Sequence, residues 1–218
     1  MKQLLKQYLS EFIGTFALVF AGTGAIVVNS QTGVLGNLGI ALVFGFIVTV
    51  MIYAIGHVSG AHINPAVTIA LFIGKKFDKK QVLPYIISQL LGATFASLLV
   101  LTIIGGDSFV GATLPRAGNF MQSFYLEIAL TFFLMFVIIG SSTDKLAYKQ
   151  FAGLAIGITV GLDALFGGPI SGASMNPARS FGPALISGNF SFQWVYWSAP
   201  IIGAILAVMA YKLIESGD

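Results

Sequence analysis

Long apolar runs dominate the chain, and polar residues are concentrated in the short segments between them. A helix rises about 1.5 Å per residue, so a run of about 20 apolar residues can cross a hydrocarbon core of about 30 Å. Two shorter apolar runs, residues 65–73 and 177–187, cannot span it, and each lies between the second and third span of one half of the chain. We expect six spanning helices, at about 8–29, 37–56, 84–104, 123–141, 151–166 and 194–214.

A ten-residue phrase occurs twice, immediately around the start of each short run. Residues 59–68 read SGAHINPAVT, and residues 171–180 read SGASMNPARS. In each copy an Asn precedes a Pro. Asn is a strong N-cap, and Pro at the first helical position loses no hydrogen bond. The phrase therefore predicts two abrupt helix starts, with half-helices over about 65–73 and 177–186.

The two halves of the chain repeat one another. A Glu-x3-Thr spacing opens each half, at Glu11 and at Glu127, and the ten-residue phrase follows in both. Because each half holds three spans, the second copy enters the membrane from the opposite face. We therefore expect one all-α membrane domain over residues 1–218, an inverted repeat of about 1–105 and 120–218. Its six transmembrane helices are joined by two re-entrant half-helices that meet N-terminus to N-terminus near the midplane.

The composition is that of a polytopic membrane protein. Of the 218 residues, 56% are hydrophobic and 9% are charged, whereas a soluble domain averages about a quarter charged residues. The pattern lacks the weak alternation of a membrane barrel, so the spans must be helical. The absence of cysteine excludes disulfides, thiolate chemistry and zinc–thiolate clusters, and we expect neither a metal nor a cofactor.

The positive charges predict the orientation in the membrane. If six helices alternate, all the lysines fall on one side, which should be cytoplasmic and should hold both termini, and only Arg116 and Arg179 are left for the opposite side. This distribution explains the net charge of +3, so no acidic partner such as nucleic acid is expected. The lysines on this side are Lys2, Lys6, Lys75, Lys76, Lys79, Lys80, Lys145, Lys149 and Lys212.

The loops before the half-helices place non-helical backbone at membrane depth. Such backbone is tolerated only where protein buries it or where it lines a cavity. We expect the loop carbonyls to line a path as acceptors, while the amides of Asn64 and Asn176 donate and two helix dipoles present positive ends. This lining exchanges hydrogen bonds with neutral polar molecules and repels cations, including hydrated protons. The carbonyls belong to Gly60, Ala61, His62, Ile63, Gly172, Ala173, Ser174 and Met175.

A few ionisable residues stand among the apolar segments. Arg179 lies in the first turn of the second half-helix, where a cation faces a positive dipole end, so we expect a functional role with a carbonyl or a solute as its partner. Glu11 and Glu127 are expected to support the loop backbones through buried hydrogen bonds. Asp163 has no assigned role, and pH sensing and packing near the membrane surface both stay open.

The chain resembles the aquaporin family over essentially its whole length. The resemblance rests on the paired Asn-Pro-Ala motifs, the arginine after the second motif, the Glu-x3-Thr spacings and the layout of six spans with two half-helices. Residues 168–184 are most similar to nodulin-26-like members and their bacterial relatives. The resemblance implies a right-handed bundle, a homotetramer with one pore per subunit, and passive flux of water or small neutral solutes. Its pore motifs are Asn64, Pro65, Ala66, Asn176, Pro177 and Ala178.

Members of this family carry a four-residue constriction, which spacing from the motifs places at Phe44, Ala164, Ala173 and Arg179. Strict water channels usually have His at the position of Ala164, so two alanines here imply a wider, half-apolar opening. We expect a passive channel in the cell membrane for water and small uncharged solutes, with glycerol first and urea or neutral metalloid acids as further candidates. Protons and ions should be excluded. Tyr196-Trp197 and Ser180 resemble the water-channel branch, so a strict water channel stays open as the alternative.

Other classes of protein are less well supported. A secondary transporter also uses inverted repeats and broken helices, but coupling an ion needs ionisable core residues, and the spans offer only Glu11, Glu127 and Asp163. A membrane-junction protein with a closed pore is a second rival. An enzyme is not expected, because no nucleophile–base pair or metal cluster stands at a recognisable spacing.

Overall fold

The computed structural model describes residues 2–105 and 111–215, and within these ranges every regular element is a helix. Six helices are long and apolar enough to cross a membrane, which confirms the six predicted spans. The two half-helices begin at Pro65 and Pro177, as the repeated phrase predicts. The α-helices are α1 (Lys2–Thr32), α2 (Gly36–Ser59), α3 (Pro65–Ile73), α4 (Lys79–Ile103), α5 (Phe120–Ile138), α6 (Ala152–Ser171), α7 (Pro177–Ser187) and α8 (Gln193–Tyr211). Short 3₁₀ or π turns occur at η1 (Arg116–Gly118), η2 (Ile139–Thr143) and η3 (Lys149–Phe151).

The long helices extend beyond the predicted spans at several ends. α1 begins at Lys2 instead of residue 8, and α6 continues to Ser171 instead of ending near residue 166. α6 passes through Pro169, whose missing N–H leaves the carbonyl of Leu165 without its helical partner. The side-chain amide of Asn37 donates to this carbonyl instead, so α6 remains satisfied through its last turn.

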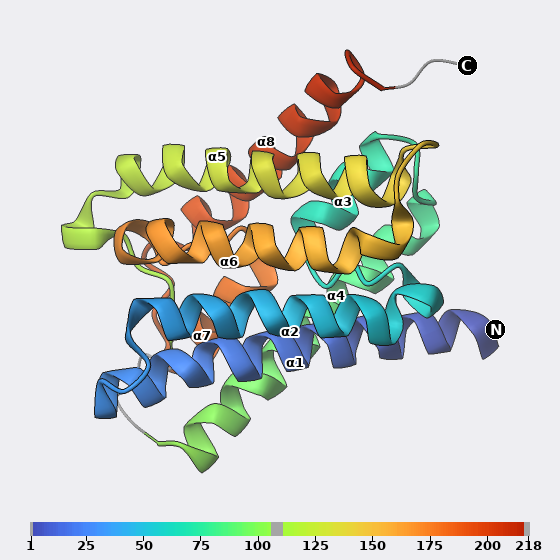
Figure 1. The fold of residues 1–218 in the computed structure, drawn as a ribbon. Coiled ribbons are helices and arrows are strands. Elements are labelled where there is room, and N and C mark those ends of the chain that lie inside the picture. Colours follow the sequence, from blue (N-terminus) through green and yellow to red (C-terminus); the bar gives the residue numbers. More distant parts are fainter. Residues whose placement is uncertain (1, 106–110, 216–218) are drawn as a thin grey trace.

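The first and last long helices of each half pack together, and one further pair joins the two halves of the chain. α1 packs against α4, α5 packs against α8, and α2 and α6 pack together between the halves. Figure 1 shows α3 toward the end of the bundle where the chain begins and α7 toward the opposite end. The start of α1 and the end of α8 lie at the same end of the bundle, while residue 1 and residues 216–218 lie outside the described residues.

Each half-helix packs against α4 and α8, the last long helices of the two halves. Glycines allow the long helices to approach at the level of their backbones: a Cβ on Gly92 would collide with the carbonyl oxygen of Phe12, and one on Gly203 with that of Ile128. Close approach through small residues is the main cohesive device between helices in lipid. The short, broken elements are therefore held inside a tight frame.

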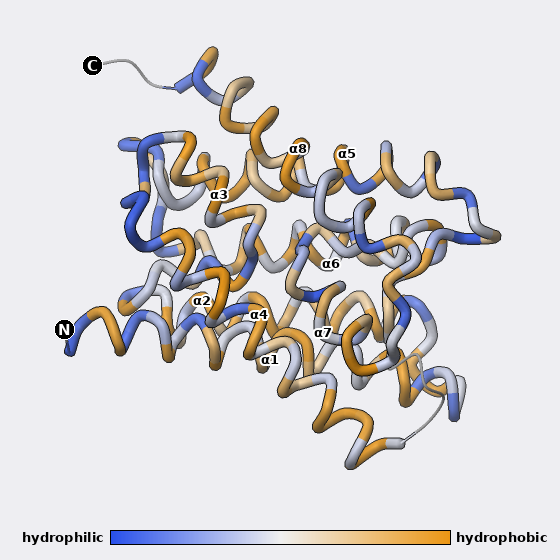
Figure 2. Tube along the Cα trace, turned by 180° about the vertical axis from the view of Figure 1, so that it is seen from behind, coloured by the Kyte–Doolittle hydropathy of each residue, from blue (hydrophilic) through white to orange (hydrophobic). Residues whose placement is uncertain are grey.

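The outer surface has the polarity of a protein that crosses a bilayer. Figure 2 shows hydrophobic residues along the long helices and hydrophilic residues concentrated at the ends of the bundle. Large apolar side chains are widely exposed on the long helices, among them Leu83 on α4 and Phe46 on α2, at 65% and 64%. Exposed apolar surface of this extent marks contact with lipid or with other protein. The chain is a multi-pass membrane protein.

Candidate functional site

A buried glutamate from α1 holds the loop between α2 and α3. One carboxylate oxygen of Glu11 accepts hydrogen bonds from the Ser59 hydroxyl at 2.7 Å and from the backbone N–H of His62 at 2.9 Å. The other oxygen accepts from the backbone N–H of Ile63 at 2.7 Å and from the Gln89 amide at 2.8 Å. The glutamate therefore satisfies loop donors that have no helical or strand partner.

Glu127 on α5 does the same for the loop between α6 and α7. One of its carboxylate oxygens accepts from the Ser171 hydroxyl at 2.7 Å and from the backbone N–H of Ser174 at 2.8 Å. The other accepts from the backbone N–H of Met175 at 2.7 Å. Both glutamates are fully buried, so each loop is tied to the first helix of its own half.

Both loops hold non-glycine residues in the left-handed region of backbone conformation. This region is rare for residues with a Cβ and costs about 1–3 kcal/mol for each residue, so the surrounding contacts must stabilise it. The glutamate hydrogen bonds supply that restraint at the adjacent amides. The residues are Ala61 (φ 47°), Ile63 (φ 43°), Ala173 (φ 40°) and Met175 (φ 53°).

The two asparagines cap the half-helices that follow them. The side-chain oxygen of Asn64 accepts from the N–H of Ala66 at 2.9 Å, and that of Asn176 accepts from the N–H of Ala178 at 3.0 Å. Both asparagines have extended backbones, as the N-cap position requires. The oxygen of each side chain is used locally, which turns the NH₂ group of each toward the other loop.

The asparagine amides cross between the two loops. Asn64 Nδ2 donates to the carbonyl of Met175 at 2.7 Å, and Asn176 Nδ2 donates to the carbonyl of Ile63 at 2.8 Å. The structure thus brings the two asparagines together at the junction of α3 and α7. An amide nitrogen carries two hydrogens, so each asparagine retains one further donor.

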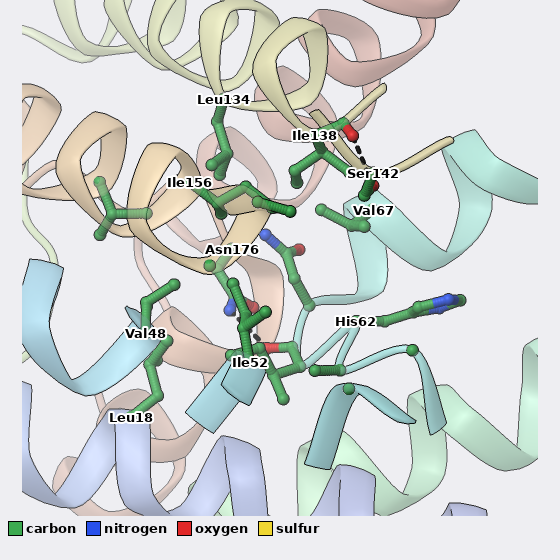
Figure 3. Close-up of a pocket in the computed structure, with 18 of the residues that line it drawn as sticks. Leu18, Val48, Ile52, His62, Val67, Leu134, Ile138, Ser142, Ile156 and Asn176 are labelled. Atoms are coloured by element: carbon green, nitrogen blue, oxygen red, sulfur yellow. Dashed lines mark hydrogen bonds between the residues drawn. The ribbon is translucent and has the colours of Figure 1, made fainter. Parts of the chain in front are cut away.

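A cavity of about 740 Å³ adjoins this junction. Figure 3 shows apolar side chains around it, together with Asn176. Its lining includes the exposed side chains of Lys76, Lys149 and Gln150 and the buried side chains of Phe44 and Arg179. Its apolar wall is formed by Leu18 (α1), Val48 and Ile52 (α2), Leu134 and Ile138 (α5), and Ile156 (α6). The cavity therefore connects a polar mouth to the paired asparagines along an apolar wall.

Most of the site residues predicted from the sequence line this cavity, but several do not. The lining includes Gly60, Ala61, His62, Ile63, Asn64, Ala173, Ser174, Met175, Asn176, Phe44 and Arg179. Among the described residues, Ala164 and Gly172 lie outside this lining, and so do the Pro and Ala of both motifs. Ala164 packs in the apolar core instead, and Gly172 ends α6 with a left-handed backbone beside Thr113. Ala66 and Ala178 are fully buried at the half-helix junction.

Arg179 is buried to 1% exposure in the lining of the cavity. Its Nη1 donates to the carbonyl of Gly111 at 2.9 Å, and its Cζ lies 5.2 Å from the ring centroid of Phe44. Within the described part of the chain, its Nε and Nη2 have no hydrogen-bond partner. Buried donors without partners are costly, so these two N–H groups are suited to a molecule that enters the cavity.

Two tyrosines also position the loops, a role that the sequence analysis assigned to neither. The hydroxyl of Tyr85 on α4 donates to the carbonyl of Ser59 at 2.9 Å, and that of Tyr196 on α8 donates to the carbonyl of Ser171 at 2.7 Å. Each tyrosine precedes by the same interval the glycine at which its helix meets the first helix of its half. This repeated Tyr-to-Gly spacing was the signal available in the sequence.

The region described offers no ligand set for a metal. No group of three or more His, Asp or Glu side chains comes together within residues 2–105 and 111–215. Asp163 is 5% exposed, and in the same ranges its Oδ2 has no hydrogen-bond partner.

Comparison with known proteins adds the relatives of this chain. Residues 1–211 match the family described as "Major intrinsic protein". The chain is 51% identical to Aquaporin NIP3-1 of Arabidopsis thaliana, over 97% of this chain and 68% of that protein. It is 44% identical to Nodulin-26 of Glycine max, over 98% of this chain and 79% of that protein. The structure is similar to that of the aquaglyceroporin from Plasmodium falciparum, with a TM-score of 0.84, 28% identity and 96% of each chain covered.

Proposed function

Because the chain belongs to the major intrinsic protein family, we propose that the cavity is part of the pathway of a passive channel for water and small uncharged solutes. One observation carries this proposal. Two asparagine amides, each with a spare N–H, meet in the middle of the bundle beside an otherwise apolar wall. The asparagine amides replace a few of the hydrogen bonds that a neutral polar molecule makes with water, and the apolar wall binds the molecule only weakly. The channel relatives also support a role without enzymatic activity.

The same junction disfavours cations. α3 and α7 direct their N-termini toward the asparagines, and each helix presents the equivalent of about half a positive charge there. Arg179 adds a full positive charge in the lining of the cavity. A hydrated proton or a metal cation therefore meets repulsion at two successive points, whereas a neutral molecule does not.

We place the constriction at Phe44, Ala164, Ala173 and Arg179. Support comes from the guanidinium of Arg179, which lies over the Phe44 ring and keeps Nε and Nη2 free of partners in the described residues. Ala173 lines the cavity, and Ala164 packs in the same apolar core cluster, so we expect a larger side chain at either position to narrow the path. A polyol can rest its carbon chain on the apolar side and direct its hydroxyls to the arginine. Glycerol is thus the first solute expected, with urea and neutral metalloid acids as further candidates.

A strict water channel is the second candidate. The 5.2 Å separation between the arginine Cζ and the phenylalanine centroid favours it, because a narrow gap passes water more readily than glycerol. Ala164 favours the broader selectivity, and the solute flux itself decides between them.

The channel is proposed to work as a homotetramer in the cell membrane, with one pore per subunit and both termini in the cytoplasm. The lysines at the end of the bundle where the chain starts support this orientation, because positive residues favour the cytoplasmic side. The widely exposed apolar faces of the long helices offer surface for both lipid and neighbouring subunits.

The test is a solute panel in proteoliposomes, with water, glycerol, urea and arsenous acid compared against empty liposomes. A passive channel accelerates flux down the gradient of each permeant solute itself, and ionophores that collapse ion gradients leave the rates unchanged. Flux that disappears with an ion gradient would identify a secondary transporter. Rates equal to those of empty liposomes for every solute, water included, would identify a closed structural protein.

A further inference from the structure

One face of α1 carries Gly14, Leu18 and Gly22, spaced four residues apart and directed into the bundle. Leu18 lines the cavity, and a Cβ placed on Gly14 would lie 2.5 Å from Cγ2 of Ile63 in the first loop. A Cβ placed on Gly22 would lie 2.6 Å from Cδ1 of Phe44 and closer still to Cε1 and Cζ. The ring of Phe44 therefore rests directly on the backbone of α1.

A side chain at position 22 would displace the ring of Phe44. Ordinary carbon–carbon contacts lie at about 3.5–4.0 Å, so an added methyl group would require the ring to move by about 1 Å or more. Phe44 lines the cavity, and the guanidinium of Arg179 lies over its ring, with Cζ 5.2 Å from the centroid. We expect a ring pushed off α1 to move into the cavity and to narrow the opening beside Arg179.

The helices behind the contact cannot easily separate instead. Next to Phe44, a Cβ on Gly45 would lie 2.8 Å from the carbonyl oxygen of Gly157, so α2 is already in backbone contact with α6. On its other side α1 is in backbone contact with α4, where a Cβ on Gly92 would collide with Phe12. α1 and α2 are thus each supported from behind, and the ring is the part that can yield.

We propose that Gly22 is a specificity-determining positioning residue, whose missing side chain lets Phe44 recess into α1 and so sets the aperture between Phe44 and Arg179. The inference rests on the proposed function, in which these two residues form the constriction. Gly22 itself does not contact the solute. Its effect is transmitted through one aromatic ring, and it should act on a glycerol-sized solute more strongly than on water.

The experiment compares Gly22→Ala with a matched control, Gly24→Ala, two positions along the same helix. A Cβ at Gly24 would lie 3.3 Å from Cδ1 of Ile104, the end of a flexible side chain, and none of its nearest neighbours belongs to Phe44. Glycerol and water permeabilities are measured in proteoliposomes at equal protein content. Gly22→Ala is expected to lower glycerol permeability about tenfold, which needs only ~1.4 kcal/mol of added barrier, and to lower water permeability less. Gly24→Ala is expected to match the wild type.

The double variant Gly22→Ala/Phe44→Ala separates the ring from general damage to packing. If the ring transmits the effect, the double variant has the glycerol permeability of Phe44→Ala alone. A loss that persists without the ring, or a Gly22→Ala protein with the wild-type ratio of glycerol to water, overturns the inference. If Gly22→Ala does not fold, a folded double variant supports the collision with the ring, and an unfolded one contradicts it.

The failure of the proposed constriction is distinguishable from these outcomes. In that case Phe44→Ala alone leaves both permeabilities unchanged, whatever position 22 does. If the wild type conducts water but excludes glycerol, water permeability becomes the readout, and the same ranking of the variants is expected. If Phe44→Ala raises glycerol permeability but Gly22→Ala leaves both permeabilities unchanged, the role of Gly22 is refuted. The proposed constriction at Phe44 then still stands.

Discussion

The substitution Glu127→Gln tests whether the carboxylate, and not merely a side chain of its size, holds the second loop. The carboxylate receives a backbone N–H on each oxygen, from Ser174 at 2.8 Å and from Met175 at 2.7 Å. An amide keeps one acceptor oxygen and replaces the other with an NH₂ group. In its better orientation the Gln retains the Ser174 bond, and its NH₂ group then opposes the N–H of Met175.

The magnitude follows from the bond that is lost. A hydrogen bond to a charged group contributes about 1.5–3 kcal/mol, and leaving a buried N–H unsatisfied costs about 1–3 kcal/mol, so we expect a loss near 3 kcal/mol in the free energy of unfolding. For a chain of this size that corresponds to roughly 6–12 °C in the midpoint of thermal unfolding. The carbonyl of Met175 accepts from Asn64 at 2.7 Å, so movement of this residue should also lower water permeability.

Thermal unfolding in detergent and water permeability in proteoliposomes are measured on the same preparations. The matched control is Glu215→Gln, which alters an exposed ion pair with Lys76 at 3.0 Å and should change stability by about 0–1 kcal/mol. Glu11→Gln is expected to behave like Glu127→Gln, because it also opposes an NH₂ group to a loop amide. A Glu127→Gln protein that unfolds and conducts as the wild type does would refute the role of the carboxylate.

Three further substitutions test the constriction and the loop supports. Arg179→Ala should raise glycerol permeability and admit protons, because it removes a fixed positive charge and widens the opening. Glycerol permeability is measured by the reswelling of proteoliposomes, and proton leakage by a pH-sensitive dye inside them. If neither rate changes, the proposed role of Arg179 is wrong. Ala164→His should narrow the opening and lower glycerol permeability more than water permeability, so an unchanged ratio of the two contradicts the proposed position of the constriction. Tyr196→Phe removes the bond to the carbonyl of Ser171 and should cost about 1–2 kcal/mol of unfolding free energy, with wild-type stability as the contrary result.

The architecture was predictable because it depends on local rules. Apolar length predicts the spans, and an Asn-Pro pair predicts where each half-helix begins. The end of α6 was not predictable in this way. The carbonyl left free by Pro169 is satisfied by Asn37, which is remote in the sequence, and a local reading cannot see such a contact.

The site was predictable in its polar residues and less so in what positions them. Asn64, Asn176 and Arg179 stand out because polar groups at membrane depth are costly. Gly22 does not stand out, since its importance depends on the ring of Phe44 lying against it, and this becomes visible only when α1 and α2 are packed together. The partner of Arg179 is a backbone carbonyl, and a carbonyl carries no sequence signature.

The most direct test of the central claim is one stopped-flow trace on proteoliposomes that are mixed with hyperosmotic glycerol. A channel for water and small uncharged solutes predicts rapid shrinkage as water leaves, followed by rapid reswelling as glycerol and water enter, both faster than in empty liposomes. Shrinkage at the rate of empty liposomes would contradict the claim that the protein is a channel. Rapid shrinkage without accelerated reswelling would contradict the broad selectivity and identify a strict water channel.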